Sequence, residues 1–283
     1  MGNSVKKVIT AAIALTLCLS VSTAFAERAP NTRTSLDKAP HLNRVKSENK
    51  EAGYDDFYKK SNPADKNFNQ KFVDYSKKLD KLNKKYKHKS SFDLNKITKS
   101  KDIVNDSSIG AGNGIIGNGS NSSYHNDFNP LNCNEGDIIL VNNPGFHIQG
   151  SIQHVQMMDS VIFNNNHQSF DSKCEISAEP DLGVIFETPN QTRSYKECYV
   201  CYVPNLSSNT YLKLTTSIEK YLGKKYLWCA SKSSNTNWYC SKVPYRAYMD
   251  YANVNIDADD GYWCLPVDIL NSDNVKLAAY YSS

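Results

Sequence analysis

Cys240 has the setting that most favours covalent chemistry in this chain. It follows two aromatic residues, Trp238 and Tyr239, and directly precedes residues 241–251, whose pattern predicts a helix. Unpaired N–H groups in the first turn of a helix, together with the helix dipole, stabilise negative charge and lower the pKa of a thiol from about 8.5. We therefore predict that Cys240 is a nucleophile.

A cysteine nucleophile needs a base within hydrogen-bonding reach, and His154 is the best candidate. It opens the alternating segment 154–158, so its ring can face a cleft while Val155 and Met157 pack on the opposite side. His147, in an irregular segment rich in Pro and Gly, is the competitor, and we expect it to be a solvent-facing loop residue. The remaining histidines lie in polar arms or turns and are not expected to act as the base: His41, His88, His125 and His167.

The N-terminal residues of the chain predict export. Lys6 and Lys7 precede the apolar run 8–21, and Ala24-Phe25-Ala26 resembles a cleavage site, so residues 1–26 read as a signal peptide. No later segment approaches the roughly 18 apolar residues that a membrane span requires. We therefore expect a secreted protein, extracellular or associated with the cell wall, with no transmembrane segment.

Seven cysteines would remain after signal removal, an odd number in a compartment where disulfides persist. A free Cys240 and up to three bridges fit this count, but the sequence does not choose among the possible pairings. The spacing Cys198-x-x-Cys201 resembles half of a zinc site, yet a strand over 197–203 would turn these two residues to opposite faces. No metal or cofactor is therefore expected. The six candidates for bridges are Cys133, Cys174, Cys198, Cys201, Cys229 and Cys264.

Charge divides the chain into a basic and an acidic part. Residues 27–100 carry 19 Lys and Arg against 10 Asp and Glu, whereas residues 101–283 carry 12 against 19. In an exported protein, such a basic segment suits the anionic polymers of a cell wall better than nucleic acid. The alternative is that the basic segment is a solvated linker.

The elements that would position Cys240 and His154 begin after a basic, partly helical N-terminal arm, residues 27–132. Within it, residues 27–64 predict disorder, and an apolar stripe at spacings of three and four predicts an amphipathic helix over 65–88. The Gly/Asn/Ser-rich tract 110–123 contains the spacing Gly-x-Gly-x-x-Gly. Its polar flanks indicate a linker and not a dinucleotide site, because that site needs a preceding strand and a following helix.

Residues 133–283 predict one α+β domain with a central antiparallel sheet. Short apolar runs bounded by Gly, Asn and Pro are typical of strands, and two longer periodic segments are typical of helices. About 150 residues suffice for one core. The predicted strands are 137–141, 152–158, 160–163, 184–187 and 198–203, and the predicted helices are 210–222 and 241–251.

Six short pieces, in this order, resemble the permuted NlpC-like hydrolases, the YiiX/YebB-like and YycO-like branch of the papain-fold superfamily. The resemblance covers about residues 133–280 and implies a permuted papain-like domain, in which the strand with the histidine precedes the helix with the cysteine. The pieces are Glu135-Gly136-Asp137-Ile138-Ile139-Leu140, His154-Val155-Gln156-Met157, Ile176 to Val184, Leu222-Gly223-Lys224-Lys225-Tyr226, Tyr239-Cys240-Ser241-Lys242 and Leu265 to Ser272.

The resemblance also implies roles for site residues. Cys240 would be the nucleophile, His154 the base, and a polar residue on the strand after His154 would orient the base. That third residue is Glu179, which can supply a carboxylate, or alternatively Ser177. Tyr239 and Ser241, on either side of the nucleophile, would lie near the oxyanion or the substrate.

These observations predict a secreted cysteine amidohydrolase or peptidase that acts on cell-wall peptides. Two alternatives remain open. The protein could be a wall-associated binding module whose catalytic pair is vestigial, or a thiol-dependent ester hydrolase or acyltransferase.

Overall fold

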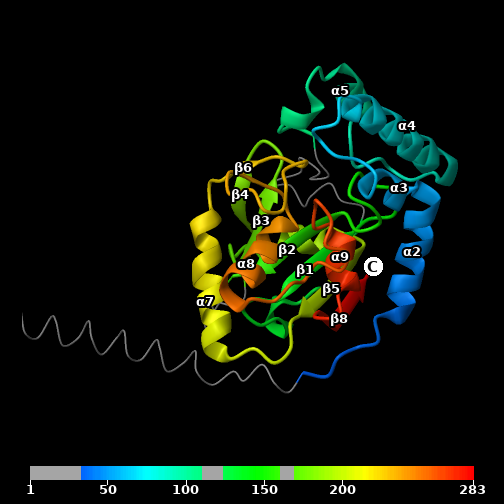
Figure 1. The fold of residues 1–283 in the computed structure, drawn as a ribbon. Coiled ribbons are helices and arrows are strands. Elements are labelled where there is room, and N and C mark those ends of the chain that lie inside the picture. The colour runs from blue at the N-terminus through cyan, green and yellow to red at the C-terminus, as the bar shows by residue number, and fades with distance from the viewer. Residues whose placement is uncertain (1–32, 110–123, 160–168) are drawn as a thin grey trace, which may run out of the picture.

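The computed structural model describes residues 33–109, 124–159 and 169–283 (Figure 1). The predicted signal peptide, the Gly/Asn/Ser-rich tract 110–123, the predicted strand 160–163 and His167 all lie outside the described residues.

The centre of the fold is a six-stranded sheet in which every neighbouring pair is antiparallel, in the order β4-β3-β2-β1-β5-β8. Together with the surrounding helices, this sheet makes the fold α+β, as predicted. The strands are β1 (Ile138–Asn142), β2 (His154–Met158), β3 (Glu175–Glu179), β4 (Gly183–Glu187), β5 (Glu197–Tyr202) and β8 (Lys276–Ser282). A small parallel pair, β6 (Lys225–Tyr226) and β7 (Asn237–Trp238), lies apart from this sheet.

The hairpin between β3 and β4 depends on a glycine. Gly183 has φ +80°, and a Cβ atom there would lie 2.2 Å from the carbonyl oxygen of Lys224. Only glycine adopts this conformation without strain and allows so close an approach. The hairpin sets the register that places Glu187 opposite Glu175.

Hydrophobic side chains form a core on each face of the sheet. Val155 and Met157 belong to the larger core, which also contains residues of α7 (Ser208–Ile218), α8 (Lys242–Ala252) and α9 (Pro266–Asn271). Met158 belongs to the smaller core on the other face, with Phe128 and Tyr195. Alternate residues of a strand face opposite sides, so His154 and Gln156 share the face of Met158.

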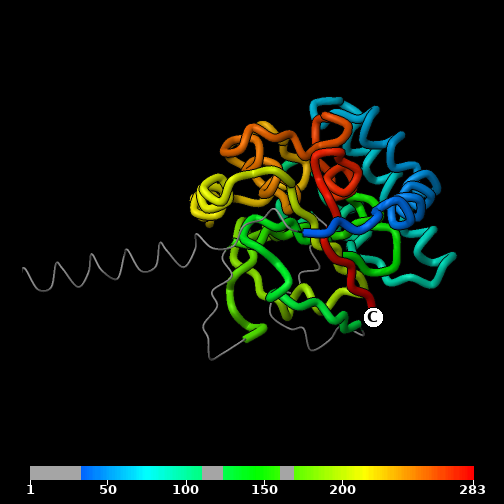
Figure 2. Tube along the Cα trace, turned by 90° about the horizontal axis from the view of Figure 1, so that it is seen from below, coloured from blue at the N-terminus to red at the C-terminus, as the bar shows by residue number. Residues whose placement is uncertain are grey.

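The N-terminal arm is folded where the structure describes it. The prediction of disorder over 27–64 is wrong for residues 39–58, which form α2 (Ala39–Ala52) and α3 (Tyr54–Tyr58). α4 (Phe68–Tyr86) lies within the range 65–88 of the expected amphipathic helix, and α5 (Leu94–Lys99) follows it. Four aromatic and apolar residues of the predicted stripe are buried: Phe68, Phe72, Tyr75 and Leu79. The arm's helices lie together beside the sheet, on the side away from α7 (Figures 1 and 2).

Each cysteine in the described ranges is a buried free thiol, so the bridges that the cysteine count allows are not formed. The sheet separates the candidates physically. Three of them lie in the smaller core (Cys133, Cys174 and Cys198) and three in the larger core (Cys201, Cys229 and Cys264). The prediction that Cys198 and Cys201 face opposite sides of a strand is confirmed. None of the helices in the described ranges combines the length and apolar character needed to cross a bilayer.

Candidate active site

Cys240 lies immediately before α8, and its exposed fraction is 3%. The N–H of Lys242 bonds to the carbonyl of Tyr239 and that of Val243 to the carbonyl of Cys240. The N–H groups of Cys240 and Ser241 therefore precede the first hydrogen-bonded turns, at the end of the helix where the dipole is positive. α8 packs against β2 and β3, which carries Cys240 to the strand of His154.

His154 is buried between Cys240 and two carboxyl groups. Its Nε2 atom lies 3.2 Å from Oε1 of Glu179 and 3.2 Å from Oε2 of Glu187. Burial alone would lower the pKa of His154. Glu187 and Glu179 outweigh burial and raise the pKa well above its usual value, and a hydrogen-bond interaction with the Cys240 thiol contributes in the same direction. The structure thus brings together the three residues that the sequence assigned as catalytic.

The two carboxyl groups beside His154 differ in how readily they ionise. Burial raises the pKa of Glu179, His154 acts to lower it, and the neighbouring Glu187 raises it again. Burial also acts to raise the pKa of Glu187, but His154 and hydrogen bonds from His154, Gln156 and Glu179 overcome it and lower the pKa. These effects, with the hydrogen bond that Gln156 donates to Glu187, favour the negative charge on Glu187 over Glu179.

A chain of buried hydrogen bonds extends behind Glu187. Gln156 Nε2 donates to Glu187 Oε2 at 2.6 Å, and Thr192 Oγ1 lies 2.9 Å from Gln156 Oε1 and 2.7 Å from Glu175 Oε2. The Thr192 hydroxyl donates to both oxygens, which therefore share one proton. Burial raises the pKa of Glu175 to about 8, and the hydrogen bond from Thr192 acts in the opposite direction.

Sequence analysis missed Glu187, Gln156 and Thr192. Gln156 carried a signal, because residues two apart on a strand share a face and His154 had been assigned to a strand. Glu187 carried a weaker one, as a single acid at the end of an apolar strand. Thr192, in the short helix α6 (Pro189–Arg193), carried none.

The other predicted site residues bind backbone groups. Ser177 Oγ donates to the carbonyl of Val155 at 2.5 Å, so Ser177 does not contact His154 through that bond. Ser241 Oγ donates to the carbonyl of Cys264 at 2.8 Å, and the Tyr239 hydroxyl accepts the N–H of Cys264 at 3.1 Å. Both neighbours of Cys240 thereby fix it to the loop before α9.

The prediction of a solvent-facing His147 is wrong. Its exposed fraction is 1%, its Nδ1 lies 2.7 Å from Ser91 Oγ, and its Nε2 lies 2.9 Å from the carbonyl of Asn143. Burial lowers the pKa of His147 to about 4. Both ring nitrogens are occupied, so His147 is a structural residue that joins the arm to the loop between β1 and β2.

Helices α2 and α3 of the arm cover the loop that leads into His154. Asn49 Oδ1 accepts the backbone N–H of Ser151 at 3.0 Å, and the Tyr58 hydroxyl donates to the carbonyl of Ile148 at 2.8 Å. A Cβ atom at Gly150, where φ is +106°, would lie 2.6 Å from the Tyr54 ring. Tyr54 is 1% exposed. The arm therefore helps to bury the site.

Two groups of side chains in the described ranges have the spacing of metal ligands. The first is His154, Glu179 and Glu187. The second is Asp257, Asp259 and Asp268, and ligand atoms in each group lie within 4.8 Å of one another. In the second group, Lys232 Nζ lies 2.6 Å from Asp257 Oδ2, so a cation of the protein already offsets its charge.

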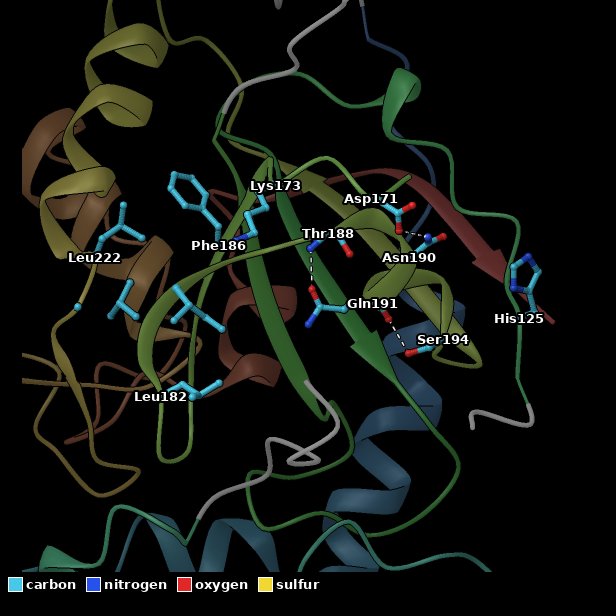
Figure 3. Close-up of a pocket in the computed structure, with 13 residues that line it drawn as sticks. His125, Asp171, Lys173, Leu182, Phe186, Thr188, Asn190, Gln191, Ser194 and Leu222 are labelled. Carbon is cyan, nitrogen blue, oxygen red and sulfur yellow. Dashed lines mark hydrogen bonds between the residues drawn. The ribbon is translucent and has the colours of Figure 1, made fainter. Parts of the chain in front are cut away.

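A cavity of about 960 Å³ lies along β4 and α6, apart from Cys240 and His154 (Figure 3). Leu182, Phe186 and Leu222 supply apolar lining, while Thr188 and Gln191 supply polar lining. The hydroxyl of Ser194, also in the lining, donates to the carbonyl of Gln191 at 2.6 Å. The cavity lacks a paired nucleophile and base, so we place the candidate chemistry at Cys240.

Comparison with known proteins gives little further information. No protein-family model matches the chain, and no curated protein matches it. Among solved structures, the chain is similar to the crystal structure of metalloprotein yiiX from Escherichia coli O157:H7, a DUF1105 protein. The sequence identity is 16%, the match covers 51% of this chain and 96% of that chain, and the TM-score is 0.39. A similarity this low carries no argument about the site.

Proposed function

We propose that this protein is a cysteine amidohydrolase or peptidase. One observation carries the proposal: α8, which Cys240 precedes, packs against β2, the strand of His154, and the His154 ring contacts the carboxyl groups of Glu187 and Glu179. The effect of the Cys240 thiol on the pKa of His154 is consistent with this placement. A thiol next to an imidazole, with a carboxylate on the other side of the imidazole, is the arrangement that activates a cysteine nucleophile.

The geometry suggests a role for each atom. Both carboxyl groups lie against Nε2 of His154, so Nδ1 is the nitrogen that takes the thiol proton. The thiolate attacks the amide carbonyl, and N–H groups at the start of α8 hold the oxyanion. His154 returns the proton to the leaving amine, and water then hydrolyses the thioester and restores the thiol. Glu187 stabilises the imidazolium throughout.

The order of elements supports a permuted papain-like arrangement for this enzyme. β2, with His154, precedes α8, with Cys240, and α8 packs against the antiparallel sheet. Residues 133–283 would then be the catalytic domain. Its covering arm must move, or a substrate must enter beneath it, because Cys240 is 3% exposed.

We infer a secreted or wall-associated location and cell-wall peptides as substrates. The predicted signal peptide and the basic composition of residues 27–100 support this proposal. On α4, Lys77, Lys81 and Lys84 are exposed, which suits an anionic wall polymer.

Digestion of purified wall peptides by the mature protein tests the activity. The wild type should release products, and Cys240→Ala should not. Cys174→Ala is the matched control, because it removes another buried thiol that lies in the smaller core. Equal release by wild type and Cys240→Ala would reject the enzyme.

The same assay separates the alternatives. An ester hydrolase or acyltransferase would act on an ester panel and leave matched amides intact. A binding module with a vestigial pair would bind wall polymer, with a strong dependence on salt, yet release nothing even as the wild type.

A further inference from the structure

The side chains of His154, Glu179 and Glu187 have the geometry of a metal site. Nε2 of His154 lies 3.2 Å from a carboxylate oxygen of each glutamate. In a tetrahedral zinc site with bonds of about 2.0 to 2.1 Å, neighbouring ligand atoms are about 3.3 Å apart. The two distances from Nε2 therefore match the edges of such a tetrahedron, and the third, between the carboxylate oxygens, lies within 4.8 Å. Cys240 lies outside this group, which leaves the fourth corner for water.

A second observation points to a ligand between the carboxyl groups. Oε2 of Glu179 and Oε1 of Glu187 receive no hydrogen bond from an N–H or hydroxyl group in the described residues, so the two carboxyl groups interact only with each other on this side. The two residues are 4% and 2% exposed. A buried carboxylate oxygen without a partner is costly. Only a proton or a cation shared between the two groups satisfies these oxygens.

We propose that His154, Glu179 and Glu187 bind a divalent zinc-type cation. The cation would displace the proton shared between the two carboxyl groups, and with a neutral imidazole the three ligands then carry a charge of −2, which matches such an ion. One nitrogen and two oxygen ligands suit zinc, whereas calcium takes six to eight oxygen ligands. The sequence alone predicted no metal, and this proposal differs from that prediction.

The surrounding structure holds the ligands in place. They lie on three consecutive strands of the sheet, with β3 between β2 and β4, and the sheet fixes their backbone positions. Gln156 Nε2 donates to Glu187 Oε2 at 2.6 Å and orients that carboxylate from behind. Hydrogen bonds of this kind orient the ligands in established metal sites.

The site stands on these three side chains and does not depend on hydrolysis. One consequence does rest on the proposed function. A metal on Nε2 withdraws electron density from the ring and weakens Nδ1 as a base, so zinc should inhibit hydrolysis and a chelator should restore it.

Cobalt binding to the full-length protein tests the site. Titration with Co²⁺ should saturate at one equivalent, give the visible absorption of a tetrahedral ion, and be reversed by Zn²⁺. Glu187→Gln and Glu179→Gln should each weaken binding by at least about 100-fold. Glu197→Gln is the matched control, a buried acid of β5 that pairs with Arg44 and lies outside the ligand group, and should bind as the wild type does.

Two further variants locate the ion. Cys240→Ser should retain cobalt binding and lose hydrolysis, so failure of the metal site and failure of the enzyme are distinguishable. Asp259→Asn alters the acidic group at Asp257 and should not change the titration. Loss of binding in Asp259→Asn with retention in Glu187→Gln would overturn the proposal, as would a wild type that binds no Co²⁺ or Zn²⁺.

Circular dichroism will show whether the two Glu→Gln variants fold. If they do not, ¹¹³Cd NMR of the wild-type protein decides. A single bound resonance in the range of nitrogen and oxygen ligands supports the site, and a resonance in the range of thiolate ligands, or none, rejects it.

Discussion

Nε2 of His154 lies 3.2 Å from Oε2 of Glu187, although the two residues are 33 positions apart in the chain and lie on strands that are not neighbours. His154 and Gln156 both stabilise the carboxylate of Glu187, which favours the negative charge on Glu187 and the proton on Glu179. Substitutions at Glu187 and Glu179 should therefore have different effects, which show which of the two orients His154.

Glu187→Gln should lower kcat/KM by at least about 100-fold, because it removes the charge that stabilises the imidazolium. Glu179→Gln should lower it by less than about 10-fold, because an amide resembles the protonated acid already present. Steady-state kinetics of the two isosteric variants on a peptide substrate compares them. The reverse order of effects would identify Glu179 as the orienting residue.

Glu175 should make stability depend on pH. Burial is the largest cause that raises its pKa from 4.5 to about 8 in the folded protein. The folded state then holds this proton more tightly than the unfolded state, so its contribution is fully present at low pH and is lost as pH rises toward about 8. Glu175→Gln keeps an acceptor for the Thr192 hydroxyl and has no group that titrates in this range.

Urea denaturation of wild type and Glu175→Gln, at about pH 5 and about pH 8, measures this difference. The variant should gain on the order of 3 kcal/mol relative to the wild type across that range. A difference in unfolding free energy that stays constant with pH would show that Glu175 is ionised in the folded protein.

Iodoacetamide should label Cys240 before any other cysteine. Burial raises the pKa of Cys174, Cys201 and Cys229 to about 12. Burial also raises the pKa of Cys133, Cys198 and Cys264 well above its usual value. Such thiols are poor nucleophiles near neutral pH. Peptide mass spectrometry over time should find Cys240 modified first, and His154→Ala should slow that reaction. Equal labelling of all seven cysteines would count against an activated thiol.

Phe72→Ala should destabilise the whole protein by about 3 to 5 kcal/mol, the usual cost of removing a buried aromatic ring. Phe72 on α4 is fully buried, and its ring stacks on Trp228 with centroids 4.3 Å apart. Leu212→Ala on α7, where the side chain is 43% exposed, is the control and should change stability by less than about 0.5 kcal/mol. Chemical denaturation compares both variants. Little effect from Phe72→Ala would indicate that the arm is a tether.

Local patterns were sufficient for several elements. The apolar runs at β1, β4 and β5 predicted strands within two residues of their observed bounds, because a short run of buried residues favours extended structure wherever it packs. The periodic segment 241–251 predicted α8 in the same way. The position of Cys240 just before this segment identified it as the candidate nucleophile. β8 went unpredicted because its burial is uneven, and it is ordered by pairing with β5.

The sequence by itself determined which residues have reactive side chains and where the most regular strands and helices form, such as β1, β5, α4 and α8, since both follow from residue type and local periodicity. Only the tertiary structure decided that Glu187 contacts His154, that α2 and α3 cover the loop before His154, and that the sheet keeps the cysteines apart. These contacts join residues far apart in the chain, and strand register and helix packing set them. The residue types at these positions do not specify which distant residues they will contact.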